Sequence, residues 1–330
     1  MAKKSLSLKA VPIVIALAAL AAIAAWFMLR EPATVPVSEE DTAPAGVYPI
    51  TRTVETTFAL KNLTGRVREN AKLLVYAPVK RTSTQRVGKI KVSHPYQLIQ
   101  DGLGNQLLAF EFENVPAKAE YELTITTTLF HANEPNTNKF EDIELKRFTG
   151  PGLYIESEAG EIKALAKQLK ADHTGTTVNN TLTWIKANIT QAAKQHPGDM
   201  SRLLARAKAW NTPESKGQGA LHALTQKTAD PLNRNYLLTA LLRANEIPAR
   251  TVLGFVYEEQ QKLNPSKAQV WVEFFADDAW HIAELVGYSI DKQPARYIAV
   301  RVLEPVPEMQ VTDLQNLIYE PVGIEAAFNG

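Results

Sequence analysis

The residue types of this 330-residue chain limit the chemistry that its side chains can do, because it has six histidines and no cysteine. Without cysteine there are no disulfides, thiolate metal ligands or thiol nucleophiles. No two histidines have the i, i+4 spacing of a metal-binding helix and no phosphate-binding glycine motif is present, so we expect no metal and no cofactor. A carboxylate–histidine hydrolase built from Asp230, His222 and Glu284 is one alternative.

The charge balance argues against binding to nucleic acid. Lys and Arg total 36 against 35 Asp and Glu, which gives a formal net charge of +1, and no terminal tail carries a single sign. One basic run, at residues 80–91, is interleaved with Thr, Ser and Gln and is typical of a solvated loop and strand start. We therefore expect no nucleic-acid partner.

An apolar stretch near the N-terminus predicts membrane attachment. Residues 10–29 carry no charge and follow Lys3, Lys4 and Lys9. A helix of this length rises about 30 Å, enough to cross a bilayer core, and the preceding cations favour a cytoplasmic N-terminus. We expect residues 1–30 to form a cytoplasmic tip and single-pass anchor in a bacterial inner membrane, followed by a tether at 31–48 and periplasmic domains. A cleaved signal peptide is the alternative.

Two hydrophobic periods divide the rest of the chain. Residues 49–150 alternate apolar and polar side chains in short runs, which predicts an antiparallel β-sandwich. Residues 151–305 change to helical spacing, and a helix buried on all sides is expected to open on Asp230 and Pro231. Together these patterns predict an α+β fold, with residues 306–330 as a C-terminal tail. The other expected helices and strands of the second region lie at residues 157–170, 176–194, 251–257, 269–275, 280–283 and 297–303.

The second region resembles the papain-like core of the bacterial transglutaminase-like superfamily. The resemblance covers about residues 155–303, and in bacterial members of the family a β-sandwich commonly precedes this core. The matching segments, in the order of the family, are Gly219-Ala220, residues 237–243 (LLTALLR), 247–250 (IPAR), 254–257 (GFVY) and 271–273 (WVE), and Trp280.

The resemblance also implies that the catalytic Cys, His and Asp positions of the family are occupied by Pro231, Gln269 and Glu284. Proline has no nucleophilic side-chain atom and glutamine cannot take up a proton near neutral pH, so we expect no enzymatic activity. Only Glu284 keeps its chemical type. Glu246 stands where the family commonly has glycine, so any left-handed residue at the end of the helix is expected at Asn245.

Inactive transglutaminase-like domains of this kind occur on bacterial membrane proteins, often with seven further transmembrane helices and encoded beside ATP-grasp ligases and retropepsin-like proteases. The resemblance therefore implies a membrane-anchored periplasmic pseudoenzyme that binds a peptide or an envelope protein, such as a retropepsin-like protease or an ATP-grasp system product. We expect the groove to be formed by the degenerate triad with Asp230 and Trp271. The alternatives are an atypical hydrolase or peptidase with non-thiol chemistry, and a structural spacer.

Overall fold

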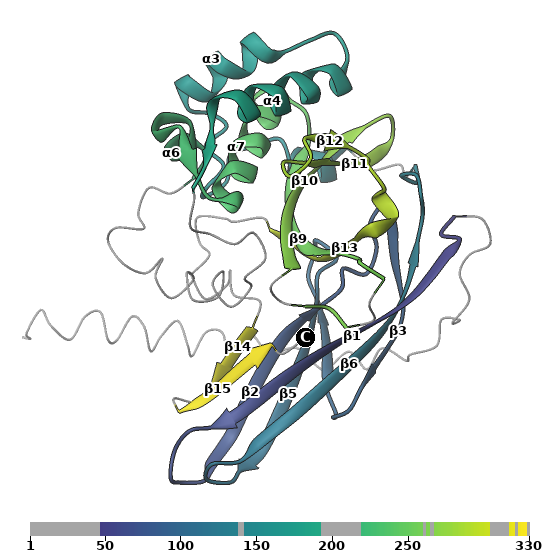
Figure 1. The fold of residues 1–330 in the computed structure, drawn as a ribbon, viewed down its shortest axis with the longest axis vertical. Helices are drawn as coiled ribbons and strands as arrows, with labels where there is room; N and C mark the ends of the chain where they lie inside the picture. The colour runs from purple at the N-terminus through teal and green to yellow at the C-terminus, as the bar shows by residue number, and fades with distance from the viewer. Residues whose placement is uncertain are drawn as a thin grey trace, which may run out of the picture. The chain divides into compact units, whose positions relative to one another are not determined.

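A computed structural model describes residues 47–137, 142–192, 219–259, 262–264, 267–303, 317–320 and 323–328 (Figure 1). These residues all belong to one compact unit, residues 41–330. The predicted transmembrane stretch at 10–29 lies outside the described residues, as does most of the predicted tether. Within the described ranges, no helix has the length and apolar character needed to cross a membrane.

The first region folds into two four-stranded antiparallel sheets with strand orders β15-β1-β6-β3 and β14-β2-β5-β4. Leu60 and Leu123 from one sheet share a buried cluster with Leu73 and Phe110 from the other, so the two sheets pack face to face. The alternating pattern placed these side chains on one face of each strand. The strands of this region are β1 (Ile50–Asn62), β2 (Arg68–Ala77), β3 (Gln85–Val92), β4 (Gln97–Gln100), β5 (Gln106–Val115) and β6 (Glu120–His131).

Two strands of this sandwich come from the segment that the sequence predicts to be a tail. β14 (Leu317–Glu320) pairs with β2, and β15 (Ile324–Phe328) pairs with β1. Ile324 is buried, and the ring of Phe328 stacks on Phe58 with centroids 4.9 Å apart. These strands have four and five residues, too few for a period-two pattern to stand out.

The second region is helical first and then forms a five-stranded sheet of order β12-β11-β10-β9-β13. Figure 1 shows α3, α4, α6 and α7 gathered on one side of this sheet. The mixed α+β fold expected from the sequence is therefore present. The helices are α2 (Asp142–Lys146), α3 (Gly160–Leu169), α4 (Thr174–Asn188), α6 (Ala220–Gln226), α7 (Pro231–Ala244) and the 3-10 helix η3 (Pro294–Arg296). The strands are β7 (Thr190–Gln191), β8 (Thr228–Ala229), β9 (Ala249–Val256), β10 (Ala268–Ala276), β11 (Ala279–Glu284), β12 (Ser289–Ile290) and β13 (Tyr297–Leu303).

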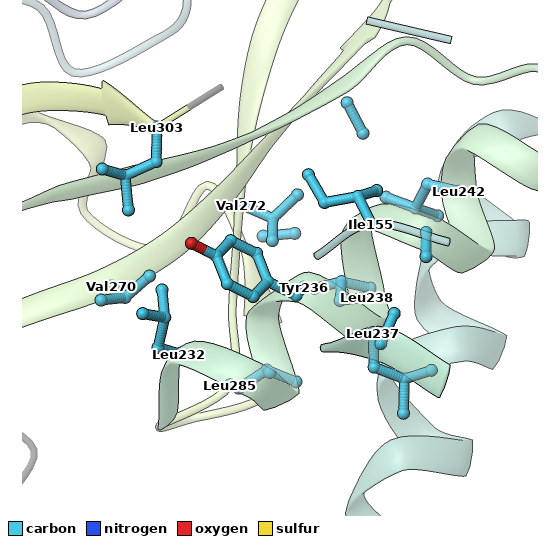
Figure 2. Close-up of a cluster of buried hydrophobic side chains, with 14 of the residues drawn as sticks. Ile155, Leu232, Tyr236, Leu237, Leu238, Leu242, Val270, Val272, Leu285 and Leu303 are labelled. Atoms are coloured by element: carbon cyan, nitrogen blue, oxygen red, sulfur yellow. The ribbon is translucent and has the colours of Figure 1, made fainter. Parts of the chain in front are cut away.

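Helix α7 is the centre of this region and has the bounds that its sequence predicts. Asp230 caps its first turn, Pro231 occupies the first position, and every residue from 232 to 243 is buried. Figure 2 shows Tyr236 beside Leu232 of the same helix and Val270 of β10, within a cluster that the helices and the sheet share. The helix is thus buried on all sides, as its leucine pattern predicts.

The end of α7 differs from the prediction. Glu246, not Asn245, has the left-handed conformation, with φ of 64° against −95° for Asn245. The Asn245 side chain donates a hydrogen bond to the carbonyl of Ala166 in α3 (2.8 Å), which holds this residue in place while the chain turns at the next one. Two other helices are shorter than predicted. Helix α3 begins at Gly160 where the prediction begins at 157, and α4 ends at Asn188 where the prediction ends at 194.

Candidate functional site

The first turn of α7 holds two of the predicted site residues. The carboxylate of Asp230, 4% exposed, accepts hydrogen bonds from the backbone N–H of Asn233 (3.0 Å) and from its Nδ2 (2.6 Å). Pro231 is half-buried beside it. Asp230 therefore acts as a helix cap, and its carboxylate already binds one of the backbone N–H groups that have no partner within the helix.

Gln269 lies near the start of β10, opposite Gly254 of β9, and is half-buried. Its neighbours Val270 and Val272 belong to the cluster that contains α7 (Figure 2). Because side chains alternate along a strand, Gln269 lies on the other face of β10. Within the described part of the chain its amide makes no hydrogen bond, so this amide is a donor and acceptor open to a ligand.

Trp271 is a core residue and does not line a groove. It is 1% exposed and packs with Val79, Val252 and Tyr297 on the face of the sheet opposite α7. Its ring lies edge-on to Tyr297 at 5.1 Å between centroids. Burial, with the charge of Glu284 as a smaller contribution, raises the pKa of Tyr297 to about 12. The expectation that Trp271 contributes to a binding surface is wrong for this reason.

Glu284 holds a turn together instead of facing a reactive partner. Its carboxylate accepts hydrogen bonds from the backbone N–H groups of Val286 (2.7 Å) and Gly287 (2.8 Å) and from the hydroxyl of Ser289 (2.8 Å). The residue is 7% exposed. In the described part of the chain, no hydrogen bond joins any two of the positions 231, 269 and 284, so the three predicted triad positions do not form a hydrogen-bonded unit.

The alternative hydrolase site is not assembled either. The ring of His222 in α6 makes no hydrogen bond with Asp230 or Glu284 in the described residues, and Glu284 is engaged in its own turn. His281 in β11 pairs with Asp291 instead, with Nδ1 2.6 Å from Oδ2. Over the ranges that the structure describes, no group of three His, Cys, Asp or Glu side chains is arranged to hold a metal ion.

The start of α7 carries buried polar residues that the sequence interpretation passed over. Arg234 is 3% exposed and donates from Nη1 to Gln191 (3.0 Å) and from Nη2 to the hydroxyl of Tyr288 (2.6 Å). Its Nε and the Oδ1 atoms of Asn233 and Asn235 are buried, and no described residue forms a hydrogen bond with them. The visible signal was Asn-Arg-Asn inside a helix that is otherwise apolar. We call Asp230, Asn233, Arg234 and Asn235 the α7 polar cluster.

Comparisons with known proteins agree with this fold. The sequence model of the transglutaminase-like superfamily matches residues 163–285. A solved structure from Cytophaga hutchinsonii, named as a candidate cysteine protease, has a TM-score of 0.53 and 15% identity, over 85% of this chain and 90% of that chain. The match spans α4, α6, α7 and the strands β9 to β11, which are the elements that surround positions 231, 269 and 284.

Two other solved structures are more distant. The periplasmic domain of TgpA from Pseudomonas aeruginosa has a TM-score of 0.37 and 12% identity, over 74% of this chain and 84% of that chain. A candidate protease from Parabacteroides distasonis has a TM-score of 0.31 and 11% identity, over 78% of this chain and 48% of that chain. A search of curated proteins finds no significant match. The family match identifies residues 163–285 as a transglutaminase-like domain.

Proposed function

We propose that this chain is a non-catalytic transglutaminase-like protein that binds a peptide or a partner protein. The observation that carries the proposal is the side-chain chemistry at the start of α7, where Pro231 offers no nucleophile, in a chain of 330 residues without cysteine. Acyl transfer and proteolysis by a thiolate need that atom, together with a base to activate it. The amide of Gln269 cannot serve as that base.

The side chain that can meet a ligand is the half-buried Gln269, which lies on the face of β10 opposite α7 and is therefore not grouped with Pro231. An amide with a free donor and acceptor can hydrogen-bond to the backbone of an extended peptide without reacting with it. Trp271 and Glu284 are left out of the proposed site because the core and the turn occupy them.

An activity assay tests the non-catalytic part of the proposal. The purified chain, incubated with a glutamine peptide and an amine or with casein, should release no more ammonia or fragments than a mock preparation. Iodoacetamide should change nothing, because no thiol is present. Activity above the mock level, retained after iodoacetamide, would instead support the alternative of a hydrolase or peptidase with non-thiol chemistry.

A site-specific crosslinker tests the binding part. A benzoylphenylalanine introduced at position 269 should crosslink to a partner in intact cells, whereas the same residue at the exposed Gln97 of β4 should not. The family resemblance suggests a retropepsin-like protease or a product of an ATP-grasp system as the partner class. Equal crosslinking from both positions would mean that binding is not specific to Gln269. No crosslinking from position 269 would contradict a partner at this residue.

We also propose that residues 10–29 anchor the chain in a bacterial inner membrane with its folded domains in the periplasm. The support is the uncharged length of this stretch and the lysines before it. Because the chain has no cysteine, one introduced thiol is the only thiol present. Ser38→Cys should react with an impermeant maleimide in intact spheroplasts, and Ser5→Cys only after lysis. A soluble periplasmic form that lacks the stretch would favour the cleaved signal peptide.

A further inference from the structure

A cavity of about 310 Å³ lies between the β-sandwich and the five-stranded sheet. Its wall is formed by residues from seven separate parts of the chain, and none of the predicted site residues is among them. Arg250 of this wall lies opposite Glu273 in the sheet. Glu273 is four residues from Gln269 along β10, a distance of about 13 Å at the rise of a strand, so the cavity and Gln269 are separate places on the sheet. The residues that carry the argument are Tyr48, Arg81, Arg147, Phe148, Arg250 and Trp280.

The inner wall of the cavity presents a fixed guanidinium. Arg250 is 7% exposed, and its Nε and Nη2 donate to the same oxygen of Glu273, at 2.9 and 2.7 Å. Its guanidinium lies 4.2 Å from the ring centroid of Trp280. Nη1 takes no part in this ion pair. A buried guanidinium held on one side by a carboxylate and on one face by an aromatic ring is preorganised to donate from its remaining edge.

The outer wall adds two more cations. Arg81 and Arg147 are exposed, and within the described part of the chain neither forms an ion pair. Nε of Arg81 lies 3.4 Å from the hydroxyl of Tyr48, which itself donates to the carbonyl of Thr82. Among the described residues of this wall, Glu144 is the only acidic one, and Glu273, which is not part of the wall, offsets Arg250. Three guanidinium groups against Glu144 and Glu273 leave a net charge of +1 at the described wall, which favours an anion inside the cavity.

The aromatic residues of the wall indicate what kind of molecule carries the anionic group. Phe148, 8% exposed, and Trp280, 3% exposed, meet edge-on with ring centroids 5.2 Å apart and both contribute to the cavity surface. Small-molecule sites combine such apolar walls with a few polar groups, and their volumes begin at about 300 Å³. A bare inorganic ion would leave the aromatic surface without a partner, whereas a carboxylate on an apolar body would use both parts of the wall.

We propose that this cavity binds a small organic carboxylate with an aromatic or similarly apolar body, either the C-terminal residue of a peptide or a free acid of that size. The carboxylate is held by the arginines of the wall, and the apolar body lies against Phe148 and Trp280. The site is separate from the one proposed at Gln269, and its failure would leave that proposal untouched.

Calorimetry with a matched pair of probes tests this site on the full chain in non-ionic detergent. N-acetylphenylalanine, which carries the carboxylate, should bind with a Kd of about 1 mM or tighter, and its neutral amide about tenfold more weakly. The double variant Arg81→Gln, Arg147→Gln should lose about tenfold in affinity for the acid. The exposed Arg66, outside the cavity wall, supplies the control Arg66→Gln, which should bind as the wild type does.

Equal affinity for the acid and the amide, unchanged affinity in the double variant, or no saturable binding would each overturn the proposal. The two surface arginines are exposed, so a loss of binding in their variant cannot be attributed to a collapsed core, and its far-UV circular dichroism should match the wild type. Two further probes separate the sources of the ligand. Binding of Gly-Gly-Phe with a free C-terminus indicates a peptide end, and binding of phenylacetate alone indicates a free acid.

Discussion

Glu284 keeps the chemical type expected at its position but has a different role, because the backbone of its own turn uses its oxygens. We predict that Glu284→Gln lowers the free energy of unfolding by about 1–3 kcal/mol, since the new amide group faces N–H donors that lose their acceptor. Urea denaturation measures this change. As a control, Glu111→Gln removes an exposed carboxylate 3.6 Å from Lys72 and should cost less than about 1 kcal/mol. Equal effects would mean that the turn contacts contribute little.

Glu246 occupies the left-handed position at the end of α7, where a side chain costs about 1–2 kcal/mol relative to glycine. Because it is exposed, no packing offsets this cost. We predict that Glu246→Gly raises the free energy of unfolding by up to about 1 kcal/mol after the entropy of the unfolded chain is counted. Glu246→Ala keeps the Cβ and should give no such gain. A gain of the same size from alanine would show that the conformation is not the cause.

His281 makes stability depend on pH. Its hydrogen bond to Asp291 and the charge of that carboxylate raise the histidine pKa, against an opposing effect of burial, and Asp277 adds to the rise. Between the unfolded value of about 6.5 and the raised folded value, the folded protein holds more protons, so stability falls as pH increases. The stability advantage of wild type over Asp291→Asn should be full at about pH 5.5, should shrink as pH rises from about 6.5 through the raised folded pKa, and should lose its pH-dependent part above that pKa. An advantage independent of pH would contradict the ion pair.

At the scale of elements, β9 passes so close to its neighbours that only glycine fits at position 254. A Cβ there would overlap the carbonyl oxygen of Ile298 in β13 and lie 2.6 Å from Cη2 of Trp271. We predict that Gly254→Ala costs about 1–3 kcal/mol, because a backbone atom cannot move aside as a flexible side chain can. Thermal unfolding of Gly160→Ala provides the control. No atom lies within 4 Å of that position, so this variant should be neutral or more stable.

The elements also show which features the sequence could predict. Helix α7 was predictable because its cap, its first-turn proline and its leucines are all local signals. The sequence could not show which face of β10 is open to a ligand, because both sides of this sheet are covered. Val272 packs toward α7, and Trp271 packs toward Val79. A strand pattern separates two faces but does not say which is open. The engagement of Glu284 depends on a turn that the sequence does not specify, so two of the five predicted site residues were misplaced.

At the scale of the whole molecule, two buried amides of the sandwich region bind the edge strand of the second sheet. Gln85 donates to the carbonyl of Ala299 (3.1 Å) and accepts from its N–H (2.9 Å). Asn105 makes the same pair of contacts with Val302, at 3.1 and 2.7 Å. Among the described strands, β13 has no partner on that side, and these side chains satisfy its backbone groups there. These four hydrogen bonds join the two regions. Because Gln85 and Asn105 are buried, water cannot take their place as partners of β13.

This junction predicts that the two regions unfold together and that cutting it separates them. Residues 49–150 contain no tryptophan, whereas Trp271 and Trp280 are buried in the second region. In a Trp26→Phe background, which removes the tryptophan of the predicted membrane stretch, tryptophan fluorescence therefore reports the second region and far-UV circular dichroism reports both. The two urea midpoints should coincide in the wild type. The double variant Gln85→Ala, Asn105→Ala removes the side-chain partners of the Ala299 N–H and of the Val302 N–H and carbonyl, at about 1–3 kcal/mol each, while the Ala299 carbonyl keeps its bond from the N–H of Val79 (2.8 Å). Its midpoints should therefore fall and diverge. The exposed Gln97→Ala should leave them together, and coincident midpoints in the double variant would mean that apolar contacts alone couple the regions.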